Sequence, residues 1–348
     1  MGSAFAILVL VVILALAFDY INGFHDTANA VATVVSTNVL PARTAIVMAA
    51  VCNFVGAFVG VGVAKTIGGD IAAPNSITQL VVAAALIGAI AWNLLTWYFG
   101  IPSSSSHALI GGVVGAVWCY RVIGGDPAGE AIWRLATSKG VLLTLEALVM
   151  SPVCGFVGGL VLMILLIWAV RGLKPARANR SFRVLQLGSG GFMAFAHGSN
   201  DAQKSMGIIT LALAAYAVQE GRAGAGDDLT IPWWVIVACA TAMGLGTASG
   251  GWRIMKTMGH RIIKLRPING FAAETAAATV ILIATWLKAP VSTTHVISSS
   301  IMGVGASKRL SAVRWGVAQN MLIAWLLTLP ISAAVSALVY FLFHTLFG

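Results

Sequence analysis

The chain alternates between long apolar runs and short polar segments. Residues 4–18 and 30–42 contain no charged residue, and comparable apolar runs cover 44–62, 77–98 and 141–170. An apolar run of about 20 residues is long enough to cross a bilayer as a helix. The strands of a membrane β-barrel would instead alternate apolar and polar residues. The pattern therefore predicts an all-α polytopic membrane protein.

Two of the predicted spans are interrupted by polar residues at matching places. The span 3–37 contains the segment 23–30, which reads GFHDTANA, and the span 184–218 contains the segment 198–204, which reads GSNDAQK. An ionisable residue at membrane depth usually faces a partner, a cavity or a substrate path. Paired interruptions in the two halves of a transporter indicate a site made from discontinuous helices. We therefore predict that both spans are broken helices.

Other positions also repeat between the halves. Pro102 and His107 have the same five-residue spacing as Pro290 and His295, with small hydroxyl residues between them in both cases. Such internal symmetry is typical of transporters built from two repeats. We assign residues 1–170 to a first transmembrane repeat and 184–348 to a second, joined by a basic cytoplasmic connector at 171–183.

The positive charge of the chain lies mainly between the apolar runs. The sequence holds 21 Lys and Arg residues against 11 Asp and Glu, a formal net charge of +10. Basic residues at Arg43, 171–183, 252–266 and Lys308–Arg309 indicate cytoplasmic loops rather than nucleic-acid contacts. Placing all of them on one side requires an odd number of crossings in each half. The repeats are then inverted, and both termini lie outside.

Two hydroxyl-rich segments, Ser103–Ser106 and Ser292–Thr294, each follow a proline and precede an apolar run. This order favours the start of a helix, with side-chain caps and exposed backbone N–H groups. Two such starts directed at one point would suit phosphate or sulfate. The alternative is that the hydroxyls only cap the helices or bond back to the helix backbone.

The carboxylates of Asp26 and Asp201 are pure acceptors when ionised, so they suit a small cation or an ion pair with Lys204. An anion binds poorly beside two bare carboxylates, and this favours a cation-coupled anion symporter. The alternative is a pair of structural aspartates hydrogen-bonded to helix ends. Amide oxygens of the same kind are offered by Asn22, Asn29 and Asn200.

Histidines could move protons near neutral pH, although a single buried histidine is more often a packed polar residue. The four candidates are His25, His107, His197 and His295. Glu274, just inside the span before the second hydroxyl segment, is a further candidate for coupling. Asp19 and Glu146 are interpreted as residues near span ends or in pairs.

The two aspartate segments and the two proline–hydroxyl–histidine segments together resemble the inorganic phosphate transporter (Pit) family, especially its bacterial low-affinity phosphate permeases. The resemblance covers essentially the whole chain. It implies two inverted repeats with broken helices and two re-entrant helical hairpins. It also implies phosphate bound between the hairpins, cations at the aspartate segments, and a homodimer.

Two departures from the family pattern bear on the coupling ion. Sodium-coupled relatives have an asparagine where this chain has Lys204, and a glutamate in the second span where it has Asn53. Lys204 can itself neutralise Asp201 or contact phosphate. We therefore expect protons rather than sodium ions as the coupling cation, with a neutral metal-phosphate complex as a further form of the cargo.

The sequence thus predicts a secondary active transporter that imports inorganic phosphate across a bacterial plasma (inner) membrane, among membrane lipids. It predicts no catalytic residue, cofactor, fixed metal site or nucleic-acid partner. A sulfate permease of the same family is the nearest alternative, and an anion channel or an intramembrane aspartyl protease are alternatives of other classes. The predicted phosphate-binding residues are Ser103, Ser104, Ser105, Ser106, Ser292, Thr293, Thr294, Thr27, Asn200 and Lys204. The predicted cation or proton coupling residues are Asp26, Asn29, Asn22, Asp201, Glu274, His25, His107 and His295.

Overall fold

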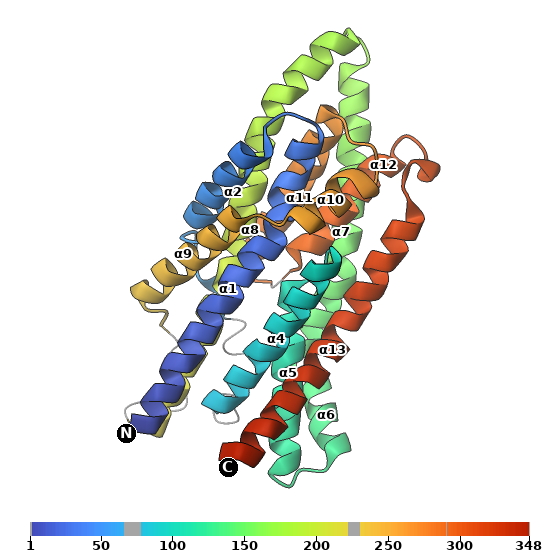
Figure 1. Ribbon diagram of the computed structural model, residues 1–348. Helices are drawn as coiled ribbons and strands as arrows, with labels where there is room; N and C mark the ends of the chain where they lie inside the picture. The colour runs from blue at the N-terminus through green and yellow to red at the C-terminus, as the bar shows by residue number, and fades with distance from the viewer. Residues whose placement is uncertain (1, 66–77, 222–229, 290, 348) are drawn as a thin grey trace.

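The computed structural model describes residues 2–65, 78–221, 230–289 and 291–347, and in these ranges all regular elements are helices (Figure 1). Within these described ranges, six helices are long and apolar enough to cross a membrane, and up to seven spans result if one bent helix pair counts as a span. The prediction of an all-α polytopic membrane protein is confirmed. Pro290, which the sequence pairs with Pro102, lies outside the described residues.

The first half comprises α1 (Gly2–Ser36), α2 (Ala42–Gly56), α4 (Gln79–Phe99), α5 (Ser105–Ile123), α6 (Ala128–Ala136) and α7 (Lys139–Val170). Helix α1 runs from the end of the molecule that holds both termini to the opposite end (Figure 1). Helices α4 and α5 form a hairpin that opens toward the terminal end. Helix α7 then crosses the molecule over its full length.

The second half comprises α8 (Pro175–Gln219), α9 (Trp233–Ser249), α10 (Trp252–Lys256), the π-helical turn η2 (Thr257–Arg261), α11 (Pro267–Trp286), α12 (Thr293–Ala306), the 3₁₀ turn η3 (Leu310–Ala312) and α13 (Trp315–Phe347). The order of long helices and hairpin matches the first half, but the directions are opposite. The α11–α12 hairpin opens away from the termini (Figure 1). This arrangement agrees with the predicted inverted repeats and re-entrant hairpins.

The two halves interlock through equivalent helix pairs. Helix α5 packs on α13 and α12 packs on α7, while α9 packs on α1 and α2 packs on α8. Glycine makes the hairpin contacts close: a Cβ on Gly115 would lie 2.0 Å from the Ala333 carbonyl oxygen, and one on Gly303 would lie 2.0 Å from that of Phe156. Small residues allow such close helix approach inside membranes. Each hairpin is therefore held by the long late helix of the other half.

The helix breaks predicted at Asn22–Asp26 and at Gly198–Lys204 are wrong, because α1 and α8 are continuous through both segments. Most of the polar side chains there form hydrogen bonds or ion pairs with other side chains. The helix backbone can therefore keep its own hydrogen bonds, which an apolar medium strongly favours. The breaks lie instead at the turns of the two hairpins and between α9 and α10, which are bent by 58°. The predicted unbroken span 44–62 is also wrong, since α2 ends at Gly56.

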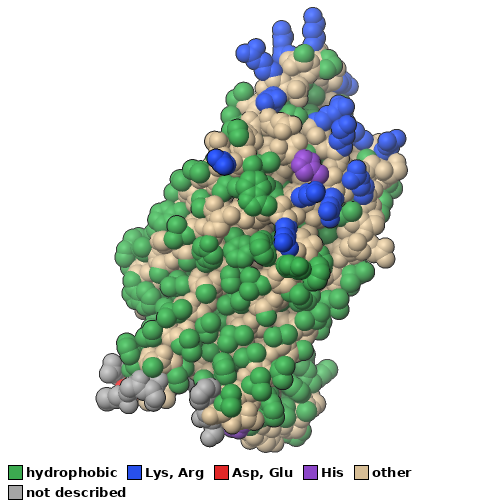
Figure 2. Space-filling model, in the orientation of Figure 1, with side chains coloured by type: hydrophobic (Ala, Val, Ile, Leu, Met, Phe, Trp, Pro, Cys, Tyr) green, Lys and Arg blue, Asp and Glu red, His purple; other side chains and the backbone are tan. Residues whose placement is uncertain are grey.

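Basic side chains gather at the end of the molecule opposite the termini, and the visible middle of the surface is largely hydrophobic (Figure 2). The basic segment 171–183 contributes to this end. Most of it is helical, because α8 already begins at Pro175. The apolar middle and the charged end fit a protein embedded in a bilayer with one strongly basic face.

Candidate functional site

The two aspartate segments meet in the centre of the molecule, where α1 packs against α8. The side chains of Asp26 and Asp201 are almost fully buried. His197 lies between them, with its Nε2 3.2 Å from Asp201 Oδ2 and 3.8 Å from Asp26 Oδ2. His25 Nδ1 lies 2.6 Å from Asp26 Oδ1 on the other side. The carboxylates are therefore separated by an imidazole, unlike a protease pair that shares one proton directly.

Lys204 supplies the positive charge that pairs with the Asp201 carboxylate. Its ammonium Nζ lies 2.5 Å from Asp201 Oδ1, and its side chain is completely buried. A buried charge of this kind requires a close partner of opposite sign. The site thus combines two carboxylates with one lysine and two histidines, a set that can offset the charge of an anion and of a cation together.

The hairpin helices α5 and α12 begin with equivalent side-chain caps. The hydroxyl of Ser104 accepts a hydrogen bond from the backbone N–H of His107 at 3.2 Å, and Ser292 accepts one from that of His295 at 3.2 Å. These two residues therefore act as helix caps, which was the alternative reading of the hydroxyl segments. The caps hold both helix N-termini, with their positive dipole ends, in defined positions.

The second hairpin reaches both aspartates through its first residues. Thr293 donates a hydrogen bond to Asp201 Oδ2 at 3.2 Å, and Thr294 donates one to Asp26 Oδ1 at 3.4 Å. The amide of Asn29 donates to Thr294 Oγ1 at 2.9 Å. The start of α12 is therefore connected to the aspartates of both halves.

The first hairpin reaches the same place through a chain of hydroxyls. Ser103 donates to Thr96 Oγ1 at 2.8 Å and lies 3.4 Å from His25 Nε2. Ser106 donates to the Val291 carbonyl at 3.4 Å, so the two hairpin turns are in direct contact. The hydroxyl of Ser105 is buried and has no hydrogen-bond partner among the described residues. It is free to bind a ligand.

Three predicted residues have no hydrogen bond to Asp26 or Asp201 among the described residues. Asn200 donates to Thr285 Oγ1 at 2.9 Å, and its own amide oxygen is buried without a partner in the described ranges. Both polar atoms of the Asn22 side chain are likewise buried and unpartnered there. The hydroxyl of Thr27 donates hydrogen bonds to the backbone carbonyls of Gly23 and Thr247, so it is already engaged by backbone groups.

His107 and His295 face each other beside the hairpin starts. Their ring centroids are 5.0 Å apart, and the His295 ring stacks on Trp325 at 4.1 Å. Trp325 in turn donates to the carbonyl of Pro102 at 3.0 Å. The ring nitrogens of both histidines lack hydrogen-bond partners among the described residues. The pair lies where the two halves meet.

Glu274 is held away from this centre, in its own polar cluster between α1, α8 and α11. Its Oε1 accepts hydrogen bonds from Thr33 at 2.5 Å and from Gln186 at 3.0 Å, and its Oε2 accepts one from Ser189. Thr37 donates to Gln186 Oε1 at 2.9 Å and extends the cluster. Side chains supply hydrogen-bond donors to both carboxylate oxygens, so Glu274 can remain buried here.

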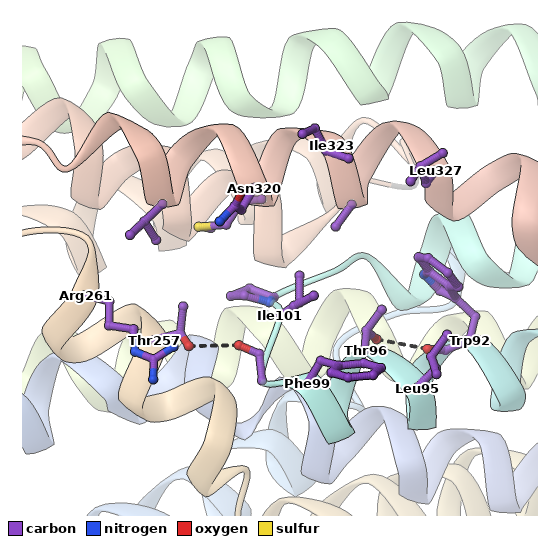
Figure 3. A pocket seen from close by; sticks show the side chains of 15 residues that line it. Trp92, Leu95, Thr96, Phe99, Ile101, Thr257, Arg261, Asn320, Ile323 and Leu327 are labelled. Carbon is purple, nitrogen blue, oxygen red and sulfur yellow. Dashed lines mark hydrogen bonds between the residues drawn. The ribbon is translucent and has the colours of Figure 1, made fainter.

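A cavity of about 470 Å³ lies beside the first hairpin turn, between α4, η2 and α13 (Figure 3). Thr96, which contacts His25, lies on its wall, and Thr257 donates to the Gly100 carbonyl at 2.8 Å across one side. Most of the other lining residues are apolar. This lining does not suit a small anion, so the central polar cluster is the candidate site.

Several functional residues were missed at the sequence level. His197 was considered as one of four histidines but not assigned to the site, although its position four residues before Asp201 places both on one helix face. The amide oxygen Oδ1 of Asn53 accepts a hydrogen bond from His197 Nδ1 at 3.1 Å, and its Nδ2 donates one to Thr247 Oγ1 at 2.8 Å. Asp19 is completely buried rather than near a span end. The sequence signal for the burial of Asp19 was its position as a charged residue inside an apolar run.

Comparisons with known proteins give one consistent result. The model of the phosphate transporter family matches residues 22–177 and 169–336. The chain is 50% identical over 341 residues to a Bacillus subtilis (strain 168) protein named "Probable low-affinity inorganic phosphate transporter", covering 97% of this chain and 98% of the relative. It is 47% identical over 339 residues to a protein of the same name from Rhizobium meliloti (strain 1021), covering 97% of both chains. Among solved structures it resembles "The sodium-dependent phosphate transporter", with a TM-score of 0.82 and 25% identity over 98% of this chain and 99% of that one.

Proposed function

Because the chain belongs to the phosphate transporter family, we propose that it imports inorganic phosphate across a bacterial plasma membrane in symport with protons, as a homodimer. The observation that carries this proposal is the meeting of two capped hairpin starts at a buried cluster of Asp26, Asp201 and Lys204. Helix N-termini and hydroxyl donors suit a tetrahedral oxyanion. The carboxylates beside them require a cation or protons to travel with it.

The side chains divide into donors and acceptors for the cargo. Ser105, Thr293, Thr294 and the Lys204 ammonium can donate hydrogen bonds to phosphate oxygens. Asp26 can accept one from a protonated phosphate oxygen. Sulfate carries no proton at neutral pH and would leave this acceptor facing an anion. The site therefore favours phosphate over sulfate.

The choice of protons over sodium rests on two side chains. The Lys204 ammonium occupies the position beside Asp201 where a metal cation would bind. Asn53 contributes an amide rather than a carboxylate, and that amide is already engaged by His197 and Thr247. Both features reduce the negative charge available to sodium ions.

A metal-phosphate complex is the second candidate cargo. Asp26, His197 and Asp201 each offer one ligand atom, and these three atoms lie within 4.8 Å of one another. Carboxylate and imidazole ligands of this kind can bind a divalent cation. The metal would then enter with phosphate rather than reside in the protein.

Competition experiments test the substrate. We expect radiolabelled phosphate uptake into proteoliposomes to be blocked by arsenate, which has the same shape and protonation, and to be little affected by sulfate. Repeating the assay with divalent cations chelated separates free phosphate from a metal-phosphate complex, since only uptake of the complex stops. Selective uptake of labelled sulfate would contradict the phosphate assignment and identify a sulfate permease.

The charge distribution also predicts the orientation, with the basic end in the cytoplasm and both termini outside. Gly129 in α6 and Gly172 between α7 and α8 suit a matched test, because a side chain added at either would meet no atom within 4 Å. In a cysteine-free background, an impermeant maleimide should label the Gly129→Cys variant in intact cells. It should label Gly172→Cys only after permeabilisation. The reverse pattern would contradict this orientation.

A further inference from the structure

Asp19 is a buried acid outside the central cluster, on the same helix as Asp26. It is completely inaccessible, and neither of its carboxylate oxygens has a hydrogen-bond partner among the described residues. The amide of Asn22, three residues along α1, and the hydroxyl of Ser205 on α8 are also buried without partners there. Buried polar groups in native proteins are almost always hydrogen-bonded. Three unpartnered groups at the α1–α8 contact therefore require an explanation.

The surroundings of Asp19 connect it to the central site. The charged and titratable groups that face it are Asp201 and Lys204 from α8 and Cys239 from α9, and Ser205 lies beside it. Lys204 is paired with Asp201 in this arrangement. A bare carboxylate at Asp19 would be strongly unfavourable, because Lys204 is engaged by Asp201 and the described neighbours offer it neutral donors, the Ser205 hydroxyl and the Cys239 thiol. A neutral carboxylic acid does not carry this penalty.

A proton fits this position better than a metal ion. In the part of the chain that the structure describes, the side-chain oxygen atoms available as ligands come from Asp19 itself, Asn22 and Ser205, and the thiol of Cys239 borders the site. A hard cation binds several oxygen ligands. The Lys204 ammonium would also repel a second cation. Protonation neutralises the carboxyl group without any ligand shell.

We propose that Asp19 carries the coupling proton, as a carboxylic acid while Lys204 is paired with Asp201 and as a carboxylate when Lys204 turns to it. In the second arrangement the carboxylic O–H bond breaks, the proton passes to water on the side that is then open, and the carboxylate pairs with the ammonium. Phosphate bound at the hairpin starts competes with Asp201 for Lys204, which links the proton to the cargo. This inference rests on the proposed proton symport.

Two transport assays on the purified full chain test the proposal. We expect Asp19→Asn to lower phosphate accumulation driven by a pH gradient at least about tenfold while phosphate–phosphate exchange without a gradient stays within about twofold of wild type. Asp19→Glu should recover driven accumulation. Glu146→Gln, which changes an exposed acid on α7, is the matched control and should leave both activities unchanged. A purely structural role would lower both activities together.

Wild-type protein provides a test that does not depend on folding of a variant. A hydrophobic carbodiimide reacts with protonated buried carboxyl groups, so peptide mass spectrometry should find the adduct on Asp19, with less adduct as the pH is raised. Absence of this adduct would overturn the proposal. So would an Asp19→Asn variant whose driven accumulation stays within twofold of wild type, or one that loses phosphate–phosphate exchange together with driven accumulation. If phosphate accumulation by the wild-type protein does not depend on the pH gradient, the proposed proton symport is wrong. If wild type responds and Asp19→Asn responds equally, only the assignment to Asp19 fails.

Discussion

Replacing Asp26 with asparagine is expected to reduce phosphate uptake by about 100-fold. The amide has nearly the same shape and can still accept hydrogen bonds from Thr294 and His25, but it cannot carry the negative charge that balances a coupled cation. Losing the charge of one buried ionised partner, and the strengthening that this charge gives to its hydrogen bonds, corresponds to about 3 kcal/mol. The measurement is the initial rate of radiolabelled phosphate uptake into proteoliposomes at equal amounts of protein.

The control for Asp26→Asn is Glu130→Gln, which neutralises an exposed acid on helix α6. It should transport like wild type. Thermal unfolding of the detergent-solubilised variants should show that Asp26→Asn is folded. Uptake by folded Asp26→Asn within threefold of wild type would show that this aspartate is a structural residue, the alternative raised from the sequence.

Replacing Lys204 with asparagine is expected to create sodium dependence. The substitution removes the ammonium 2.5 Å from Asp201 and supplies an amide oxygen in its place, so Asp201 becomes available to a metal cation. At fixed pH, sodium should raise phosphate uptake by the variant about tenfold, the effect of about 1.4 kcal/mol of cation binding. The wild-type rate should change little under the same conditions.

Two further variants make the lysine result specific. Lys204→Met removes the charge without supplying an oxygen ligand, and it should lose uptake without gaining a sodium response. Lys139→Asn, at an exposed position at the start of α7, should behave like wild type. A Lys204→Asn protein that stays folded, active and indifferent to sodium would show that the lysine does not determine the coupling ion.

Much of the fold could be predicted because hydropathy and internal symmetry report on whole helices. The predicted span 3–37 and the apolar runs 77–98 and 141–170 correspond closely to α1, α4 and α7, and the repeated proline–hydroxyl–histidine segments mark the hairpin turns. The error at α1 and α8 has a clear cause. A polar residue inside an apolar run shows that something polar is nearby, but not whether a neighbouring side chain or an opened backbone provides it.

The candidate site could be predicted only in part. Residue type and matched spacing indicated Asp26, Asp201 and the hydroxyl segments, and the structure brings most of them together. Contacts between distant helices were not accessible, so neither the placement of His197 between the aspartates nor the link from Asn53 to it could be derived. For the same reason the sequence could not show that Glu274 has a separate set of partners.

Asp19 illustrates a different limit. Its position near the start of the polar segment suggested a span end, whereas α1 continues through it to Ser36 and buries it against α8 and α9. Depth within the bundle depends on how the helices pack, and hydropathy does not contain that information. The buried acid became visible as a candidate for coupling only when its neighbours were known.

The coupling ion is the central claim, and it is tested most directly by phosphate uptake into proteoliposomes of wild-type protein under pH and sodium gradients imposed separately. An inward proton gradient without sodium should drive phosphate above its equilibrium concentration, and adding a sodium gradient at fixed pH should not increase this accumulation. Accumulation that requires sodium would contradict proton symport, while leaving family membership intact. Uptake that only reaches equilibrium under either gradient would contradict symport altogether and indicate an anion channel.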